Sequence, residues 1–146
     1  MSHDQRETEE DRKHQKVIMK AVAKHYGAEL QVVETLGKYK IDGILYNGRE
    51  VIGYVEAKWL KKDTMFGINV PKYVEGCQLA AYSKVPFMYA VRIPGKCGIS
   101  ILHDGIWAPD VVELKHSGGT PPGKDPNWDD KEPMMMINRD SIEWIS

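Results

Sequence analysis

The stretch from Tyr39 to Lys58 constrains the fold more than any other part of the chain. Two runs rich in Ile, Val, Leu and Tyr flank the dipeptide Asn47-Gly48. Asn and Gly tolerate the positive φ of a tight turn, so this pattern predicts a β-hairpin. Charged side chains stand in the hairpin where apolar packing would not select them. These are Asp42, Glu56 and Lys58.

The positions of the three charged residues predict a metal site. Strand side chains alternate between the two faces of a sheet, so Glu56 and Lys58 share a face and Ala57 points to the other. Pairing of the strands brings Asp42 near Glu56, and two half-buried carboxylates raise each other's pKa. A divalent cation removes that repulsion, and hard oxygen ligands suit Mg²⁺. With Lys58 beside a metal-bound water or a phosphate oxygen, the group suits phosphodiester hydrolysis.

These residues also resemble a family signature. Asp42 is followed, after thirteen residues, by Glu56-Ala57-Lys58 at the end of an apolar strand. This spacing is similar to the motif of the PD-(D/E)xK nuclease superfamily, with Ile41 in place of the proline that names the motif. The resemblance extends over about residues 10–92 and includes the junction-resolvase and RecB-like exonuclease branches.

The resemblance implies an α/β, restriction endonuclease-like fold, in which two helices flank a mixed central sheet. It implies a Mg²⁺-dependent deoxyribonuclease, with Mn²⁺ able to substitute, in which Asp42, Glu56 and the Ala57 carbonyl hold the metal. The implied function is that of an endonuclease that cuts DNA during replication, recombination or repair. The alternatives are a RecB-like exonuclease and an inactive DNA-binding or assembly protein with this fold. A solvated ion pair of Glu56 and Lys58, which would contribute little to stability, is the non-functional alternative.

The first helix is predicted from about Arg6 to Tyr26. One helical stripe carries Val17, Ile18, Ala21 and His25. Extended through His14, the stripe reaches Glu10, with Glu7 near its edge. The resembling family has a first-helix acid that completes the metal site, so Glu10 is its candidate and Glu7 the reserve. An acid that only complements the helix dipole is the alternative.

A mixed basic and aromatic linker is predicted over Trp59–Val70, next to the expected site. Lys61 and Lys62 can hold a phosphate backbone, and Trp59 can stack on a base. An ordinary loop whose apolar residues pack beneath it is the alternative.

The second helix is predicted over Lys72–Lys84, because Pro71 suits a first helical turn. Gln78 and Tyr82 lie one turn apart on it. They resemble the Gln-x-x-x-Tyr motif of RecB-like nucleases, in which this pair lies beside the active site. The resemblance therefore implies that both residues line the substrate side, and Lys72 can also reach the site.

The remaining pattern predicts short strands around these elements. They are Leu30–Glu34, Phe87–Ile93, Gly98–His103, Val111–Leu114 and Met134–Ile137, the last at a sheet edge, followed by a helical turn over 141–145. The Gly- and Pro-rich stretch 115–133 is predicted to be a long flexible loop. The expected organisation is a single nuclease domain over residues 1–146. Its core covers about residues 6–114, and a C-terminal strand and turn cover 134–146.

Composition limits the partners. A chain of 146 residues with 42% hydrophobic content suits one domain with a single core. No apolar run approaches the ~20 residues of a membrane span, and the polar N-terminus shows no secretory signal. A cytoplasmic location without a membrane partner is therefore expected. The net charge of −1 means that DNA contacts must come from local clusters of Lys and Arg. A homodimer is left open, since junction resolvases are usually dimers.

Overall fold

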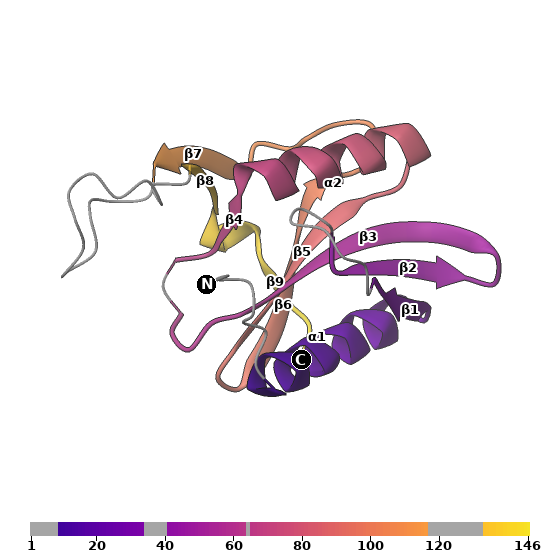
Figure 1. Cartoon of the computed structure of the whole chain (residues 1–146), viewed down its shortest axis with the longest axis horizontal. Helices are drawn as coiled ribbons and strands as arrows, with labels where there is room; N and C mark the ends of the chain where they lie inside the picture. The colour runs from indigo at the N-terminus through magenta and orange to yellow at the C-terminus, as the bar shows by residue number, and fades with distance from the viewer. Residues whose placement is uncertain (1–8, 34–40, 64, 117–132) are drawn as a thin grey trace, which may run out of the picture.

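The computed structural model describes residues 9–33, 41–63, 65–116 and 133–146. In this part of the chain, a helix lies on each face of a six-stranded sheet, and a second sheet of three strands lies near the start of the second helix (Figure 1). In chain order the elements are α1 (Glu9–Tyr26), β1 (Glu29–Val32), β2 (Gly43–Asn47), β3 (Glu50–Trp59), β4 (Gly67–Asn69), α2 (Val70–Ser83), β5 (Phe87–Ile93), β6 (Lys96–His103), β7 (Val112–His116), β8 (Pro133–Ile137), the 3₁₀ turn η1 (Arg139–Ser141) and β9 (Glu143–Trp144). Neither described helix combines the length and the apolar character needed to cross a membrane.

The large sheet has the strand order β1-β2-β3-β5-β6-β9. Its β3–β5 pair is parallel, and its other pairs are antiparallel. Parallel neighbours need a long connection, and α2 lies within that connection. The mixed sheet with its two flanking helices confirms the predicted fold class.

The β2–β3 hairpin is confirmed, with its turn one residue further along than predicted. Asn47 pairs with Glu50, which leaves Gly48 and Arg49 as the turn residues. Gly48 has φ +64°, a conformation that glycine adopts without the steric cost of a side chain. Glycine is the usual residue at the first central position of a two-residue hairpin turn when that position has a positive φ.

The buried face of α1 differs from the predicted stripe by a small rotation. Its buried residues are Ile18, Met19 and Val22, whereas Val17 is 40% exposed. These residues pack against one face of the large sheet, on Leu45, Val55, Met88, Ala90, Cys97 and Ile99. Sequence periodicity admits several neighbouring stripes on a helix, and contact with the sheet selects one of them.

The strand β5 divides its side chains between the two helices. Phe87, Tyr89 and Val91 belong to the cluster that packs under α2, and Met88 and Ala90 belong to the cluster over α1. This double burial explains the continuous apolar run of the strand.

The helix α2 begins at Val70, two residues before the predicted start. Asn69 caps it, because its side-chain Oδ1 accepts a 2.9 Å hydrogen bond from the main-chain N–H of Lys72. The helix also lies close to the sheet at Gly76. A Cβ at that position would meet the ring of Phe87 at 2.2 Å, so only glycine allows the approach.

The structure corrects three other predictions. The linker 59–70 contains the end of β3 and the strand β4, because Gly67–Asn69 pairs with β8. The strand over Met134–Ile137 is not an edge strand, since β8 pairs with β4 on one side and β7 on the other. The helical turn expected over 141–145 is replaced by η1 and by β9, which pairs with β6.

Parts of the prediction lie outside the described residues. They are the start of the first helix with Glu7, the first residues of the predicted hairpin and most of the loop 115–133. At the edges of that loop, β7 continues through His116 and β8 begins at Pro133.

Candidate active site

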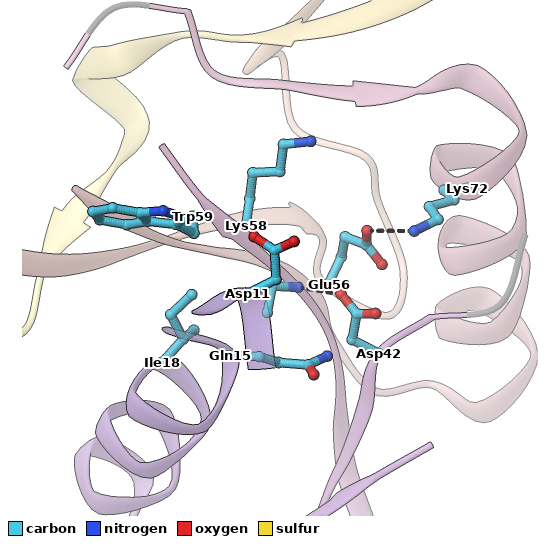
Figure 2. Close-up of a pocket in the computed structure, with 9 residues that line it drawn as sticks. Asp11, Gln15, Ile18, Asp42, Glu56, Lys58, Trp59 and Lys72 are labelled. Atoms are coloured by element: carbon cyan, nitrogen blue, oxygen red, sulfur yellow. Dashed lines mark hydrogen bonds and ion pairs between the residues drawn. The ribbon is translucent and has the colours of Figure 1, made fainter. Parts of the chain in front are cut away.

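A pocket of about 270 Å³ opens where α1, the start of β2, the end of β3 and the first turn of α2 meet (Figure 2). It is lined by Asp11, Gln15, Ile18, Asp42, Glu56, Ala57, Lys58, Trp59 and Lys72. The structure therefore brings together the three charged residues of the hairpin. It also places three further predicted residues, Ala57, Trp59 and Lys72, at the same pocket.

Asp42 lies directly before β2, and its position is held by the hairpin. Its main-chain N–H donates to the carbonyl of Val55, and its Oδ2 accepts a 2.8 Å hydrogen bond from the main-chain N–H of Ala57. Burial raises the pKa of the Asp42 carboxyl, against the opposing charge of Lys72 and the bond from Ala57. The side chain is thus fixed against the strand that carries Glu56.

Glu56 is the buried acid of the pocket, with only 5% of its surface exposed. Its Oε2 lies 3.0 Å from Nζ of Lys72, and its Oε1 has no hydrogen-bond partner within the described residues. Burial, followed by the negative charge of Asp42, raises the pKa of Glu56 to about 8, although Lys72 opposes the change. A buried and a partly buried carboxylate lie close together here, so one of them tends to keep its proton.

These features fit a hard divalent cation. A buried carboxylate oxygen without a partner is costly, and a cation between Asp42 and Glu56 would satisfy it and offset the repulsion. In the described part of the chain, no three side chains of His, Cys, Asp or Glu form a group that could hold a metal. The two carboxylates could serve as side-chain donors, and main-chain oxygen and water would complete the coordination, as Mg²⁺ tolerates.

Two lysines reach the pocket from different elements. Lys58 follows Glu56 on the same face of β3, and Lys72 comes from the first turn of α2 (Figure 2). Both lower the pKa of Asp42 by their positive charge, Lys72 by more than Lys58. The lysine of the recognised motif is therefore not the one that lies closest to the acids.

The first-helix acid that the structure places at the pocket is Asp11, which sequence reasoning missed. Glu10 does not line the pocket. Its side chain is 64% exposed and lies 3.6 Å from Nε2 of His14. A signal was present in the sequence, because Asp11, Gln15 and Ile18 follow helical spacing.

Trp59 is already stacked within the protein. Its ring lies parallel to that of His14, with centroids 3.6 Å apart and planes 9° apart. Nδ1 of His14 lies 3.0 Å from Nη1 of Arg92, which donates to it. The face of Trp59 covered by His14 is therefore unavailable to a base, and the cluster joins α1 to the ends of β3 and β5.

Four predicted substrate residues lie elsewhere. Gln78 and Tyr82 are exposed on α2, Tyr82 with 90% of its surface, because the buried residues of that helix are Gly76 and Ala80. The remaining two, Lys61 and Lys62, are exposed in the segment after β3. None of the four lines the pocket.

Comparisons with known proteins agree with this architecture. Among solved structures, Hjc from Archaeoglobus fulgidus, a Holliday junction resolvase from an archaeal hyperthermophile, aligns with a TM-score of 0.56. The alignment covers 89% of each chain at 11% sequence identity, so it concerns the fold. A search of curated proteins found no significant match.

A family model provides the assignment by sequence. The model described as "Phage putative PDDEXK endonuclease" matches residues 1–144. That match covers nearly the whole chain and includes the Asp42 and Glu56-Ala57-Lys58 motif. The predicted superfamily is confirmed, and the protein belongs to this phage family of PD-(D/E)xK nucleases.

Proposed function

We propose that this protein is a DNA endonuclease that depends on a divalent metal and cuts at the pocket of Asp42 and Glu56. Membership of a nuclease family supports the reaction class. The observation that carries the proposal is the buried Glu56, whose Oε1 has no partner within the described residues while Asp42 lies beside it. Such a carboxylate pair is unfavourable in a protein interior and becomes favourable when a cation binds.

The proposed ion is Mg²⁺, with Mn²⁺ as a substitute. Asp42, Glu56 and the Ala57 carbonyl would hold it. When bound, it would lower the pKa of a coordinated water and offset charge on the phosphate. Asp11 takes the place of Glu10 as the proposed first-helix acid, because it lines the pocket and Glu10 does not.

The cationic residues have distinct proposed roles. Lys58, which lines the pocket and is exposed, orients the attacking water and stabilises negative charge that develops on the phosphate. Lys61 and Lys62 follow on the exposed chain and are positioned for more distant backbone phosphates. The exposed positions of Gln78 and Tyr82 favour the endonuclease over the RecB-like alternative. That alternative depended on these two residues lying beside the active site.

The form of the DNA is proposed from the structural neighbour. Hjc is a junction resolvase, and the likeness to it concerns the fold, so four-way junction DNA is a substrate to test rather than one to assume. Symmetric cutting of a junction requires two active sites, so the proposal for that substrate includes a homodimer. Light scattering of the purified protein, alone and with a junction, measures this directly.

The deciding experiment is a cleavage assay on supercoiled, linear duplex, single-stranded and four-way-junction DNA. Each substrate is incubated with Mg²⁺, Mn²⁺ or EDTA, and the isosteric variant Glu56→Gln is the matched control. Cutting that requires metal and is lost in Glu56→Gln is the expected result, and the preferred substrate defines the specificity. DNA binding without cutting on any substrate would instead support an inactive binding protein.

A further inference from the structure

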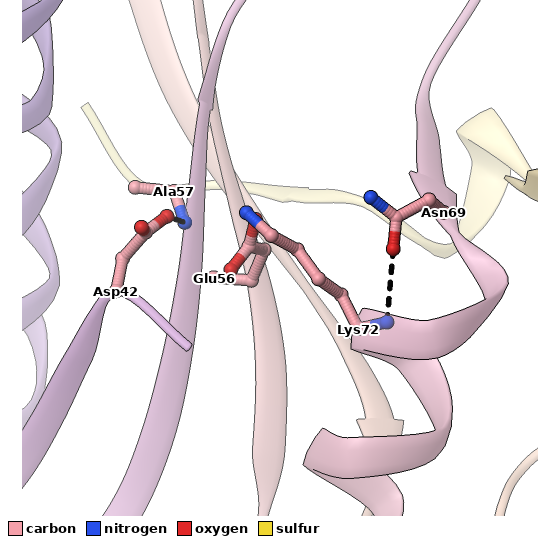
Figure 3. Close-up of polar contacts among 5 residues, drawn as sticks. All are labelled: Asp42, Glu56, Ala57, Asn69 and Lys72. Atoms are coloured by element: carbon pink, nitrogen blue, oxygen red, sulfur yellow. Dashed lines mark hydrogen bonds and ion pairs between the residues drawn. The ribbon is translucent and has the colours of Figure 1, made fainter. Parts of the chain in front are cut away.

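Lys72 makes the closest cationic contact with the acids of the pocket. Its Nζ lies 3.0 Å from Oε2 of Glu56, and only 24% of its side chain is exposed (Figure 3). It also lowers the pKa of both Asp42 and Glu56 through its charge. The ammonium group therefore stabilises negative charge on both carboxylates and not on Glu56 alone.

Several features of the fold aim Lys72 at this position. Asn69 caps the helix at the main-chain N–H of Lys72, which fixes the first turn of α2 (Figure 3). Gly76, one turn further on, lets the helix lie close to the sheet at Phe87. Glu56 lies on the same face of β3 as Tyr54, which belongs to the core cluster under α2. Three features therefore position this contact. They are the Asn69 cap, the close approach of α2 to the sheet at Gly76 and the alternation of side chains along β3.

A cation at this position has a consequence for metal binding. A divalent ion held by Asp42 and Glu56 would bring a second positive charge to the carboxylate that Nζ already contacts, and like charges close together repel strongly in a partly buried site. The ammonium, which contacts Oε2 of Glu56, and a metal bound through Oε1 would therefore oppose each other at the same carboxylate. Lys72 also lines the open pocket, so its ammonium has space to move away from the acids.

We propose that Lys72 is an internal counter-cation that occupies the Asp42–Glu56 pair in the metal-free protein and must be displaced when a divalent metal binds. This inference rests on the proposed function. It adds that the metal affinity of the free protein is limited by a residue outside the recognised motif.

The test is a calorimetric titration of the full chain with Mg²⁺ alone, without DNA. Lys72→Met removes the competing charge and keeps much of the side-chain volume, so we expect Mg²⁺ to bind at least about fivefold more tightly, the lower end of ordinary coupling between sites. Loss of the lysine also raises the affinity of the same two acids for protons, which compete with the metal. The affinity for Mg²⁺ should rise by more, because the metal carries twice the charge.

Two further variants control for general effects. Lys58→Met removes a charge of the same sign from the same pocket, but within the described residues the ion pair of Glu56 is made by Lys72 and not by Lys58, so its effect on Mg²⁺ affinity should be clearly smaller. Lys72→Arg keeps a cation at the position and should retain the affinity of the unchanged protein. If the affinity for Mg²⁺ rose equally in Lys58→Met and Lys72→Met, the overall charge of the pocket would explain the effect, and the inference would be overturned.

A second measurement accounts for folding. Loss of Lys72 should lower the melting temperature in EDTA, yet the rise in melting temperature on adding Mg²⁺ should be larger than in the unchanged protein. Unchanged or weaker Mg²⁺ affinity in Lys72→Met would show that the lysine does not compete with the metal. The inference would then be wrong, whereas the proposed function would stand as long as metal-dependent cutting persisted. If the unchanged protein bound neither Mg²⁺ nor Mn²⁺ and cut no DNA, the proposed function would fail together with it.

Discussion

The carboxylate of Asp42 accepts a 2.8 Å hydrogen bond from the main-chain N–H of Ala57, the residue between Glu56 and Lys58. This bond ties the entry of β2 to the end of β3 and places the two acids at one pocket. Asp42 thus has Oδ2 bound to the main chain, and Glu56 has Oε2 bound to Lys72. Oε1 of Glu56, which has no hydrogen-bond partner among the described residues, marks the place where we expect the metal.

Removal of either acid should abolish cleavage and preserve the fold. In Asp42→Asn and Glu56→Gln the side-chain shape is kept, but a negatively charged ligand is lost. We expect cleavage to fall by more than about 100-fold, since even outer partners of metal ligands contribute 10- to 100-fold. Initial rates on the preferred DNA substrate measure this, and circular dichroism checks the fold. Cutting at the unchanged rate by either folded variant would disprove the site.

The stability of the metal-free protein should fall as pH rises from about 4.5 to about 8. The pKa of Glu56 is about 8 in the folded chain, because burial and then the charge of Asp42 raise it from 4.5. Within that window the folded chain holds a proton that the unfolded chain has released. Its free energy of unfolding therefore decreases with pH. The raised pKa of Asp42 acts in the same direction.

Urea denaturation in EDTA at several pH values measures this dependence. Glu56→Gln has no titrating group at that position, so its free energy of unfolding should decline less over the same window. Identical pH profiles for the two proteins would contradict the assignment of the buried proton to this pair. Saturating Mg²⁺ should flatten the profile of the unchanged protein, because the metal replaces the proton.

Asp11, and not its neighbour Glu10, should contribute to cleavage. Asp11 lines the pocket, whereas the largely exposed Glu10 faces His14. We expect Asp11→Asn to reduce the rate by at least about tenfold, the lower limit for a group that supports a metal site. Glu10→Gln should stay close to the unchanged rate. The two variants form a matched pair of adjacent acids, and a larger loss in Glu10→Gln would restore the original prediction.

Lys58 should affect turnover more than metal binding. It lines the pocket and is exposed, so its charge is available to the phosphate and the attacking water. Removing a preorganised group that stabilises developing charge typically lowers kcat by about 10²–10³-fold. Lys58→Met should show such a loss in single-turnover cleavage, and calorimetry should show little change in Mg²⁺ affinity. A large loss of affinity instead would assign Lys58 to the structure of the metal site.

The stack of His14 on Trp59 should couple the first helix to the sheet. Offset-stacked and edge-to-face aromatic pairs contribute about 0.5–1.5 kcal/mol beyond their buried area, which sets the scale for this closer, nearly parallel pair. A double-mutant cycle with His14→Ala, Trp59→Ala and the combined variant should return a coupling free energy in that range. Chemical denaturation of the four proteins provides the values. A coupling near zero would show that the two rings pack independently.

The sequence pattern was sufficient to predict the hairpin and three residues of the candidate site. The alternation of β3 places Glu56 and Lys58 on one face, and Gly48 permits the tight turn that returns the chain toward Asp42. Both signals are local, because strand period and turn chemistry depend on neighbouring residues. The resemblance to a nuclease signature rested on the same local spacing.

The rest of the pocket depended on how elements pack. Each residue turns a helix face by about 100°, so a small error in the stripe of α1 exchanges Glu10 for Asp11. A regular Gln-x-x-x-Tyr spacing likewise could not reveal that Gln78 and Tyr82 face outward, since the contact at Gly76 sets the orientation of α2.

By itself, then, the sequence determined the hairpin, the pair of acids and the family to which they belong. Tertiary structure decided which helix residues meet that pair, namely Asp11 from α1 and Lys72 from α2. The physical reason is the distance along the chain over which each interaction acts. Backbone turns and strand alternation act between near neighbours, whereas the rotation and approach of a helix are set by the surface on which it packs.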